Sequence, residues 1–119
     1  MAEMTNSPIL RGLSYLFSHE GKLRVAHCLD LDLVASGSTL EEAEDRLNTL
    51  VLVQIATAFK SGNWSQLKFT APPEYWHSIE TAQPLESGRL EVEVPPVVLP
   101  VERYTATLPV ARFEMAMVA

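Results

Sequence analysis

Two acidic residues spaced two positions apart are the feature of this sequence that most resembles a chemical site. Asp30 and Asp32 could together hold a divalent cation, because hard cations prefer carboxylate oxygens. With His27 beside them, such a cation would activate water, and the chain would be a metal-dependent hydrolase. The alternative is that both aspartates lie in a solvated loop and belong to an acidic surface offered to a basic partner. We predict this alternative, with no metal and no cofactor.

A second pair of reactive side chains, His27 and Cys28, is adjacent in sequence. Neighbouring residues on a strand point to opposite faces, so the imidazole cannot readily activate the thiol as a nucleophile. We expect Cys28 to be a small buried apolar residue. Because it is the only cysteine, an internal disulfide is impossible, and one free thiol is typical of the reducing cytoplasm. We therefore predict a cytoplasmic protein that is not an enzyme and has no catalytic residues.

Acidic residues are concentrated in one part of the chain. Between Val25 and Phe59 the only base is Arg46, and the acids are Asp30, Asp32, Glu41, Glu42, Glu44 and Asp45. One interpretation is a solvated helix face whose acids complement the helix dipole. The other is an electrostatic match to a basic protein, which speeds association and selects partners. The net charge of −6 opposes direct binding to nucleic acid.

The acidic residues must be positioned by a sheet and a helix. Apolar and aromatic residues predict strands at Leu13–Ser18, Leu23–Leu29 and about Leu33–Ser36, with Gly21 in the first turn and Gly37 ending the third strand. Thr39 and Glu42 then form a capping box that starts a helix. The helix should run to about Lys60, with Gly62 ending it.

The second half of the predicted helix, Leu50 to Ala56, is apolar nearly all round. Such a segment needs cover on more than one side. The C-terminal part of the chain or another subunit could supply it.

The rest of the chain predicts a connection followed by strands. Residues 61–87 contain a short helix that starts near Pro73 and covers about Glu74–Thr81. The aromatic residues of this connection, Trp64, Tyr75 and Trp76, are expected to pack against the core. Alternation predicts a strand at Arg89–Val94 that Pro95 ends, and a second strand after Pro109, over about Ala111–Val118. A helix is the less favoured alternative for this last segment. An amphipathic edge strand of this kind can pair with a second chain, so we predict a homo-oligomer.

Length and composition fit a single domain over residues 1–119, with a core over about 9–60, the connection at 61–87 and C-terminal strands over about 88–118. The chain is 47% hydrophobic and 20% charged, which allows a packed core. We see no secretory signal, and no apolar run is long enough to span a bilayer.

The segment from Leu13 to Phe59 resembles the HicB family. The motifs that carry the resemblance are Val25-Ala26, Cys28-Leu29-Asp30-Leu31-Asp32, Ser36-Gly37-Ser38-Thr39 and Glu41-Glu42-Ala43. The family pattern has one residue between the serine and the glycine of the turn, whereas Ser36 directly precedes Gly37 here. Cys28, Gly37, Thr39 and Ala43 are thus expected to be structural positions of the motif.

The resemblance implies a HicB-like β-β-β-α-β core within the α+β class, similar to a partial double-stranded-RNA-binding domain or a degraded RNase H-like fold, here with extra C-terminal strands. Members of the family are typically antitoxins that bind and cover HicA, a small basic toxin that cleaves mRNA. Many also carry a C-terminal DNA-binding module. Residues 61–119 lack a basic recognition helix, because their cations, Lys68, Arg89, Arg103 and Arg112, are scattered. A solitary regulatory or structural module without a toxin is the other possibility.

Overall fold

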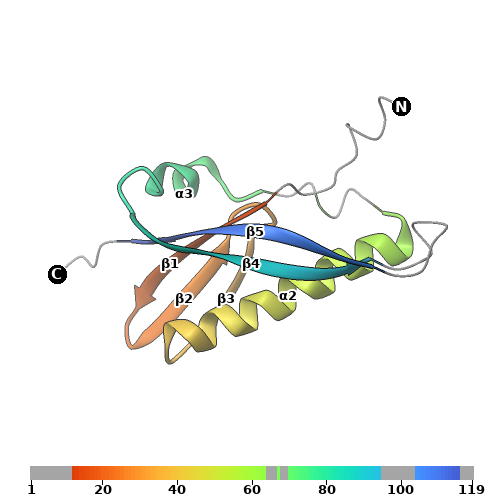
Figure 1. Cartoon of the computed structure of the whole chain (residues 1–119). Helices are drawn as coiled ribbons and strands as arrows, with labels where there is room; N and C mark the ends of the chain where they lie inside the picture. The colour runs from red at the N-terminus through yellow and green to blue at the C-terminus, as the bar shows by residue number, and fades with distance from the viewer. Residues whose placement is uncertain (1–11, 64–66, 68–69, 95–103, 116–119) are drawn as a thin grey trace.

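The computed structural model of the chain describes residues 12–63, 67, 70–94 and 104–115. These residues form two helices and five strands (Figure 1). In chain order they are β1 (Leu13–Glu20), β2 (Leu23–Cys28), β3 (Leu33–Gly37), α2 (Leu40–Ser61), α3 (Pro73–Ser78), β4 (Gln83–Val94) and β5 (Tyr104–Glu114).

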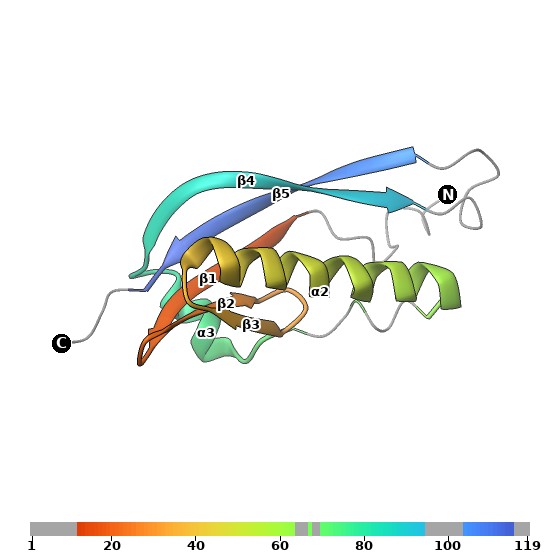
Figure 2. The same ribbon diagram turned by 90° about the horizontal axis from the view of Figure 1, so that it is seen from below.

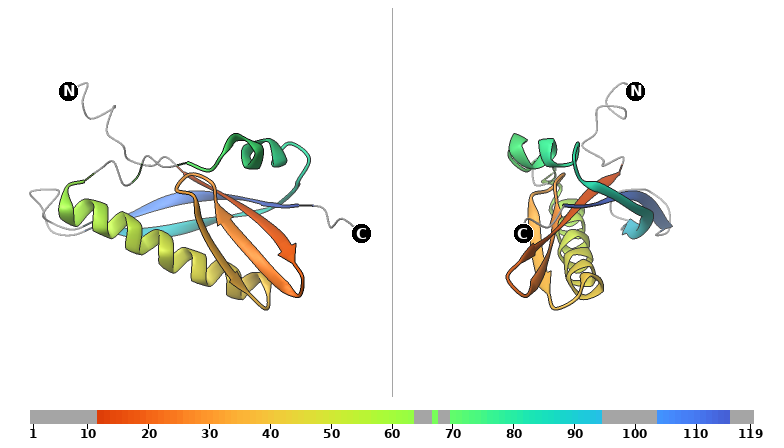
Figure 3. Two further views of the ribbon diagram at one scale, coloured as in Figure 1. Left: turned by 180° about the vertical axis from the view of Figure 1, so that it is seen from behind. Right: turned by 90° about the vertical axis from the view of Figure 1, so that its left-hand side faces the viewer.

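The five strands form one mixed sheet with the order β3-β2-β1-β5-β4. β1 and β5 are parallel, and the other neighbours are antiparallel. The predicted α+β class is therefore confirmed, with three strands, a long helix and two further strands. α2 packs on one face of the sheet, and α3 covers part of the other (Figures 2 and 3).

Strand alternation divides the side chains between the two faces. Tyr15 and Phe17 of β1 point toward α2 and belong to the main core cluster. Leu16, between them, points the other way and packs in a second cluster with Trp76 of the α3 side. The apolar run in β1 is therefore buried on both faces of the sheet.

The signals at the two ends of α2 work largely as predicted. The hydroxyl of Thr39 accepts a hydrogen bond of 3.0 Å from the amide of Glu42, and Gly62 takes a left-handed conformation at φ 69°. A capping box also implies a hydrogen bond from the amide of Thr39 to the Glu42 carboxylate, and this expectation was wrong. The carboxylate accepts instead from the amide of Ser38, at 2.6 Å. The Ser38 hydroxyl also donates to it, at 2.9 Å, so the carboxylate bonds both groups of one residue.

The C-terminal strands differ from the predicted ones in their bounds. β4 begins at Gln83, inside the predicted connection, and continues through a bulge between Leu85 and Gly88. Because β4 lies at the edge of the described sheet, one row of its amide groups points away from β5, and Pro84 is tolerated there. The predicted ending of this strand at Pro95 lies outside the described residues.

β5 was predicted to begin after Pro109 and in fact contains it. Pro109 pairs with Arg89 of β4, whereas the pairing with β1 begins one residue later, at Val110. The amide group that proline lacks is therefore not needed by β1. β5 ends at Glu114, so the prediction that Met115 belongs to the strand was wrong. The rest of the predicted extension, to Val118, lies outside the described residues.

The apolar half of α2 receives part of the cover that it was predicted to need. Val51 and Ile55 are buried in the main core cluster, to which β4 contributes Leu90 and Val92. Leu50 and Val53, on another side of the helix, stay 42% and 58% exposed. The buried residues of α2 lie on one face of the helix, and β4 continues the cover of that face within the described structure.

Gly37 joins β3 to α2 at a very close approach. A Cβ atom built on it would lie 2.8 Å from the backbone nitrogen of Ala43 and 2.9 Å from the Cβ of Glu42. Neither atom is the end of a flexible side chain, so the first turn of α2 would have to move. The motif position Gly37 therefore needs glycine for space.

We predict that Gly37→Ala lowers the free energy of unfolding by about 1–3 kcal/mol, because the overlap forces β3 and α2 apart. Urea unfolding followed by circular dichroism measures this change. Gly21→Ala is the matched control: its left-handed φ of 64° costs some strain, but nothing lies within 4 Å of the new methyl group. Equal losses in the two variants would contradict the close-packing explanation.

Candidate functional site

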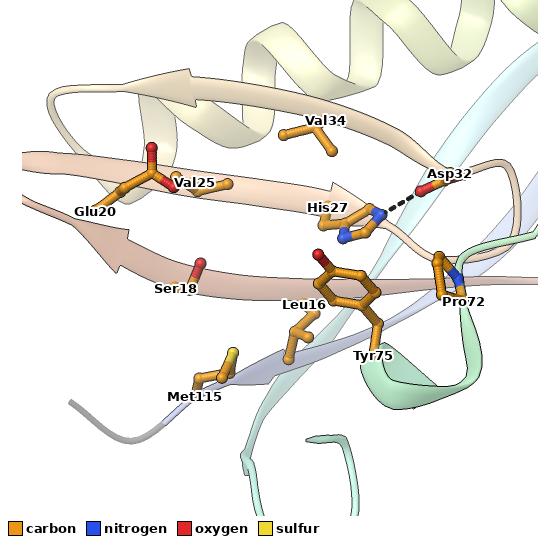
Figure 4. Close-up of a pocket in the computed structure, with 10 residues that line it drawn as sticks. All are labelled: Leu16, Ser18, Glu20, Val25, His27, Asp32, Val34, Pro72, Tyr75 and Met115. Carbon is orange, nitrogen blue, oxygen red and sulfur yellow. Dashed lines mark hydrogen bonds and ion pairs between the residues drawn. The ribbon is translucent and has the colours of Figure 1, made fainter. Parts of the chain in front are cut away.

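A groove lies on the face of the sheet opposite α2, where α3 leaves β1 to β3 partly uncovered (Figure 4). Its volume is about 340 Å³. The side chains that line it come from the three N-terminal strands, from the loop between β2 and β3, from α3 and its start, and from the residue after β5. They are Leu16, Ser18, Glu20, Val25, His27, Asp32, Val34, Pro72, Tyr75 and Met115.

The groove exists because α3 is short and is held near one end of the strands. The amide of Ala71 donates to the carbonyl of Leu29 at 2.8 Å, and the indole of Trp76 donates to the hydroxyl of Thr70 at 3.0 Å. These bonds fix the start of α3 beside the loop between β2 and β3. The helix ends after Ser78, so it cannot extend along β2 and β3. Val34 and Tyr75 are left 52% and 40% exposed.

His27 and Asp32 form the polar centre of one end of the groove. The Nε2–H of His27 donates to a carboxylate oxygen of Asp32 at 2.7 Å, and the ring of Tyr75 meets that of His27 edge to face at 4.8 Å. His27 is buried, whereas the Asp32 side chain is 44% exposed. Asp32 has a positive φ of 54°, a conformation that aspartate tolerates better than most residues. This backbone turn places its carboxylate against His27.

The charged groups of the groove are carboxylates. Glu20 lies near one end of the groove and Asp32 near the other, with the apolar side chains of Val25, Val34 and Leu16 between them (Figure 4). None of the ten residues that line it is a lysine or an arginine. Such a surface suits a segment that presents cationic groups around an apolar centre.

The same residues do not form a nucleophilic triad in this arrangement. Ser18 shares the groove with His27 and Asp32, but no hydrogen bond joins its hydroxyl to the imidazole among the described contacts. Within the described part of the chain, no three His, Cys, Asp or Glu side chains gather as metal ligands.

Asp30 and Asp32, the pair considered as metal ligands, point to different partners. The Asp30 carboxylate accepts from the amide of Ser14 at 2.5 Å and so ties the β2–β3 loop to β1. Burial raises the pKa of Asp30, and the hydrogen bond from Ser14 opposes this only in part. Asp32 instead faces His27. The structure thus separates a structural aspartate from one that lines the groove.

The predicted acids on α2 also divide into two kinds. Glu44 receives two hydrogen bonds from the guanidinium of Arg112, at 2.8 and 2.9 Å, and Glu42 caps the helix and contacts Arg46 at 3.3 Å. The hydrogen bonds from Ser38 hold the pKa of Glu42 below its usual range. Glu41 and Asp45 are exposed, one helical turn apart. Together with Asp32, they are the predicted acids whose side chains are most open to a partner.

Cys28 and His27 lie on opposite faces of β2, as predicted. Cys28 is fully buried in the core under α2, while His27 faces the groove. Burial raises the pKa of the Cys28 thiol to about 12, and the charge of Asp30 acts in the same direction. Ala43, which belongs to the same predicted motif, is also fully buried in this core.

Several groove residues were not singled out in the sequence. The first strand was predicted to end at Ser18, but β1 continues to Glu20, whose side chain lines the groove. Tyr75 was expected in the core with Trp64 and Trp76; instead it is exposed beside His27, Trp76 is partly buried, and Trp64 lies outside the described residues. The alternation of Leu16, Ser18 and Glu20 along β1 was a usable signal, because alternate residues share one face.

Comparison with known proteins identified no relative. No family model, no curated protein and no solved structure matches the chain. Neither described helix is long and apolar enough to cross a membrane.

We predict that Cys28 does not react with a thiol reagent in the folded protein, because it is buried and its pKa favours the neutral thiol. Ellman's reagent at pH 8 should modify it only after denaturant is added. Val34→Cys provides the positive control, since Val34 is 52% exposed in the groove. Rapid modification of Cys28 in the native wild-type protein would contradict its placement in the core.

We predict opposite effects of two substitutions at Asp30. Asp30→Ala removes the acceptor of the Ser14 amide and should cost about 1–3 kcal/mol of unfolding free energy. Asp30→Asn keeps an acceptor and removes a charge that burial disfavours, so it should be neutral or stabilising at pH 7.

The pH dependence of Asp30→Asn follows from the raised pKa of Asp30 in the folded chain. Folded wild-type protein loses stability as the pH rises from about 4, the unfolded value, through the raised folded value. The advantage of Asp30→Asn over the wild type should therefore grow across this window and vanish below it. Urea titrations of both proteins at several pH values test this, and a constant difference would contradict it.

Proposed function

We propose that this chain is a HicB-like protein-binding module that acts as an antitoxin, by covering a small basic toxin that cleaves mRNA. The observation that carries the proposal is the groove on the open face of the sheet. Its charged side chains, Glu20 and Asp32, are acidic, and an apolar floor lies between them. Inhibition by occlusion requires a complementary surface and no catalytic group.

The fold and the charge distribution support this function. The order of three strands, a long helix and further strands agrees with the arrangement that the HicB resemblance implies. The net charge of −6 favours a basic protein over nucleic acid as the direct partner. The fully buried Cys28 and Ala43 and the close-packed Gly37 fit structural roles within the motif.

A hydrolase that uses Asp30 and Asp32 receives no support from the geometry. One carboxylate is engaged with the backbone of β1 and the other with His27. A solitary HicB-like module, without a toxin, would use the same groove for another basic protein. A reading frame for a basic protein next to the gene of this chain would favour the antitoxin.

We predict that the tagged chain, purified from its native host, retains a small basic protein in a stoichiometric complex. The purified partner then allows titration calorimetry against two double variants. Glu20→Gln with Asp32→Asn neutralises the groove and keeps the hydrogen-bonding atoms, whereas Glu41→Gln with Asp45→Asn removes the same charge from α2.

The groove variant should weaken binding about 10- to 100-fold, and the helix variant should change it by less than about threefold. The reverse result would move the partner to the acidic surface of α2. If neither variant weakens binding, or if the stoichiometric partner is acidic, the electrostatic basis of the proposal fails.

A further inference from the structure

The outer edge of β4 is a second candidate interaction surface, separate from the groove. β4 is the last strand on its side of the described sheet and, at twelve residues, the longest of the five strands. Long exposed edges are templates for strand addition, and proteins usually protect them with charges or bulges. β4 has both, because Arg89 and Glu91 are exposed and the bulge lies between Leu85 and Gly88.

The charges on this edge are arranged so that the edge complements itself. Arg89 and Glu91 lie two residues apart, so their side chains share the face of the sheet opposite α2. Leu90 and Val92, on the other face, are buried in the core with α2. The Gly88–Val92 segment thus has a cation and an anion placed symmetrically about Leu90.

We propose that two copies of this chain pair through β4, antiparallel and centred on Leu90, to form a dimer with one continuous ten-stranded sheet. A two-fold axis perpendicular to the sheet pairs residues that share a face. In this register Arg89 of each copy lies directly opposite Glu91 of the other, at the spacing where cross-strand pairs interact. Two ion pairs form, and Gly88 lies opposite Val92.

The neighbouring registers are disfavoured by the same charges. Centring the axis on Glu91 also gives two ion pairs, between Arg89 and Glu93, but it places the Glu91 carboxylate opposite itself, a repulsion that the proposed register avoids. Centring the axis on Arg89 places the guanidinium opposite itself. Centring it on Val92 sets Glu91 against Glu93. The bulge bends the strand before Gly88 and limits pairing to the following segment. The edge therefore selects one partner, a second copy, and one alignment.

The interface is small, since it consists mainly of one strand pair and two ion pairs. A dissociation constant in the micromolar range is expected. This inference goes beyond the proposed function, since it concerns assembly of the chain with itself and does not depend on any toxin.

Analytical ultracentrifugation of the full chain, from about 1 to about 200 µM, tests the proposal. The wild type should change from monomer to dimer over this range. Arg89→Glu places acids opposite acids, and Glu91→Arg places bases opposite bases, so each variant should weaken the dimer at least about tenfold. Both residues are exposed, and unchanged circular dichroism spectra and melting temperatures verify the fold.

Mixing the two single variants gives the decisive result. In the proposed register, a heterodimer of Arg89→Glu with Glu91→Arg restores both ion pairs, so the equimolar mixture should dimerise while each variant alone does not. The double variant R89E/E91R should also recover wild-type dimerisation. A wild type that stays monomeric at about 200 µM, variants that dimerise as the wild type does, or a mixture that stays monomeric would each overturn the proposal.

Discussion

The parallel pairing of β5 with β1 is the interaction on which the rest of the structure depends. It joins the three N-terminal strands and the β4–β5 pair into one sheet. Charged side chains on β5 reinforce the junction. The guanidinium of Arg112 binds Glu44 of α2, donates to the backbone carbonyl of Glu86 at 2.9 Å and lies 5.3 Å from the centre of the Phe17 ring. Glu114 forms a second ion pair, with Arg24 of β2. Because these groups are mostly shielded from water, losing one partner would leave the other charge poorly solvated.

This junction also determines which surfaces of the sheet stay open. With β5 inserted beside β1, the two edges of the described sheet are β3 and β4. α2 occupies one face and extends along the β4–β5 hairpin, so α3 is the remaining described helix on the other face (Figure 2). A helix of six residues cannot cover five strands. The groove over β1 to β3 is therefore a consequence of element lengths.

The features that sequence reasoning predicted correctly depend on local chemistry. Thr39, Gly62 and Gly21 each act through atoms a few residues away, so their patterns specify the helix ends and the first turn. The extents of β4 and β5 depend on pairing between distant segments, and Pro84 and Pro109 gave misleading local signals because each lies where one strand edge needs no amide donor.

The groove was harder still to predict. His27, Asp32 and Tyr75 come from a strand, a loop and a helix, and their meeting requires the placement of α3 by Ala71 and Trp76.

The groove and the β4 edge are compatible with each other, and the proposed dimer would carry two grooves. The groove lies over β1 to β3, whereas β4 is at the opposite edge of the sheet, so pairing through β4 leaves the groove open. A two-fold axis perpendicular to the sheet places both grooves of the proposed dimer on the same face. A partner that is itself dimeric, or that presents two basic segments, would engage both grooves, and its second contact would then be intramolecular. A weak dimer would in turn be stabilised by such a partner, because binding that requires two copies favours their association.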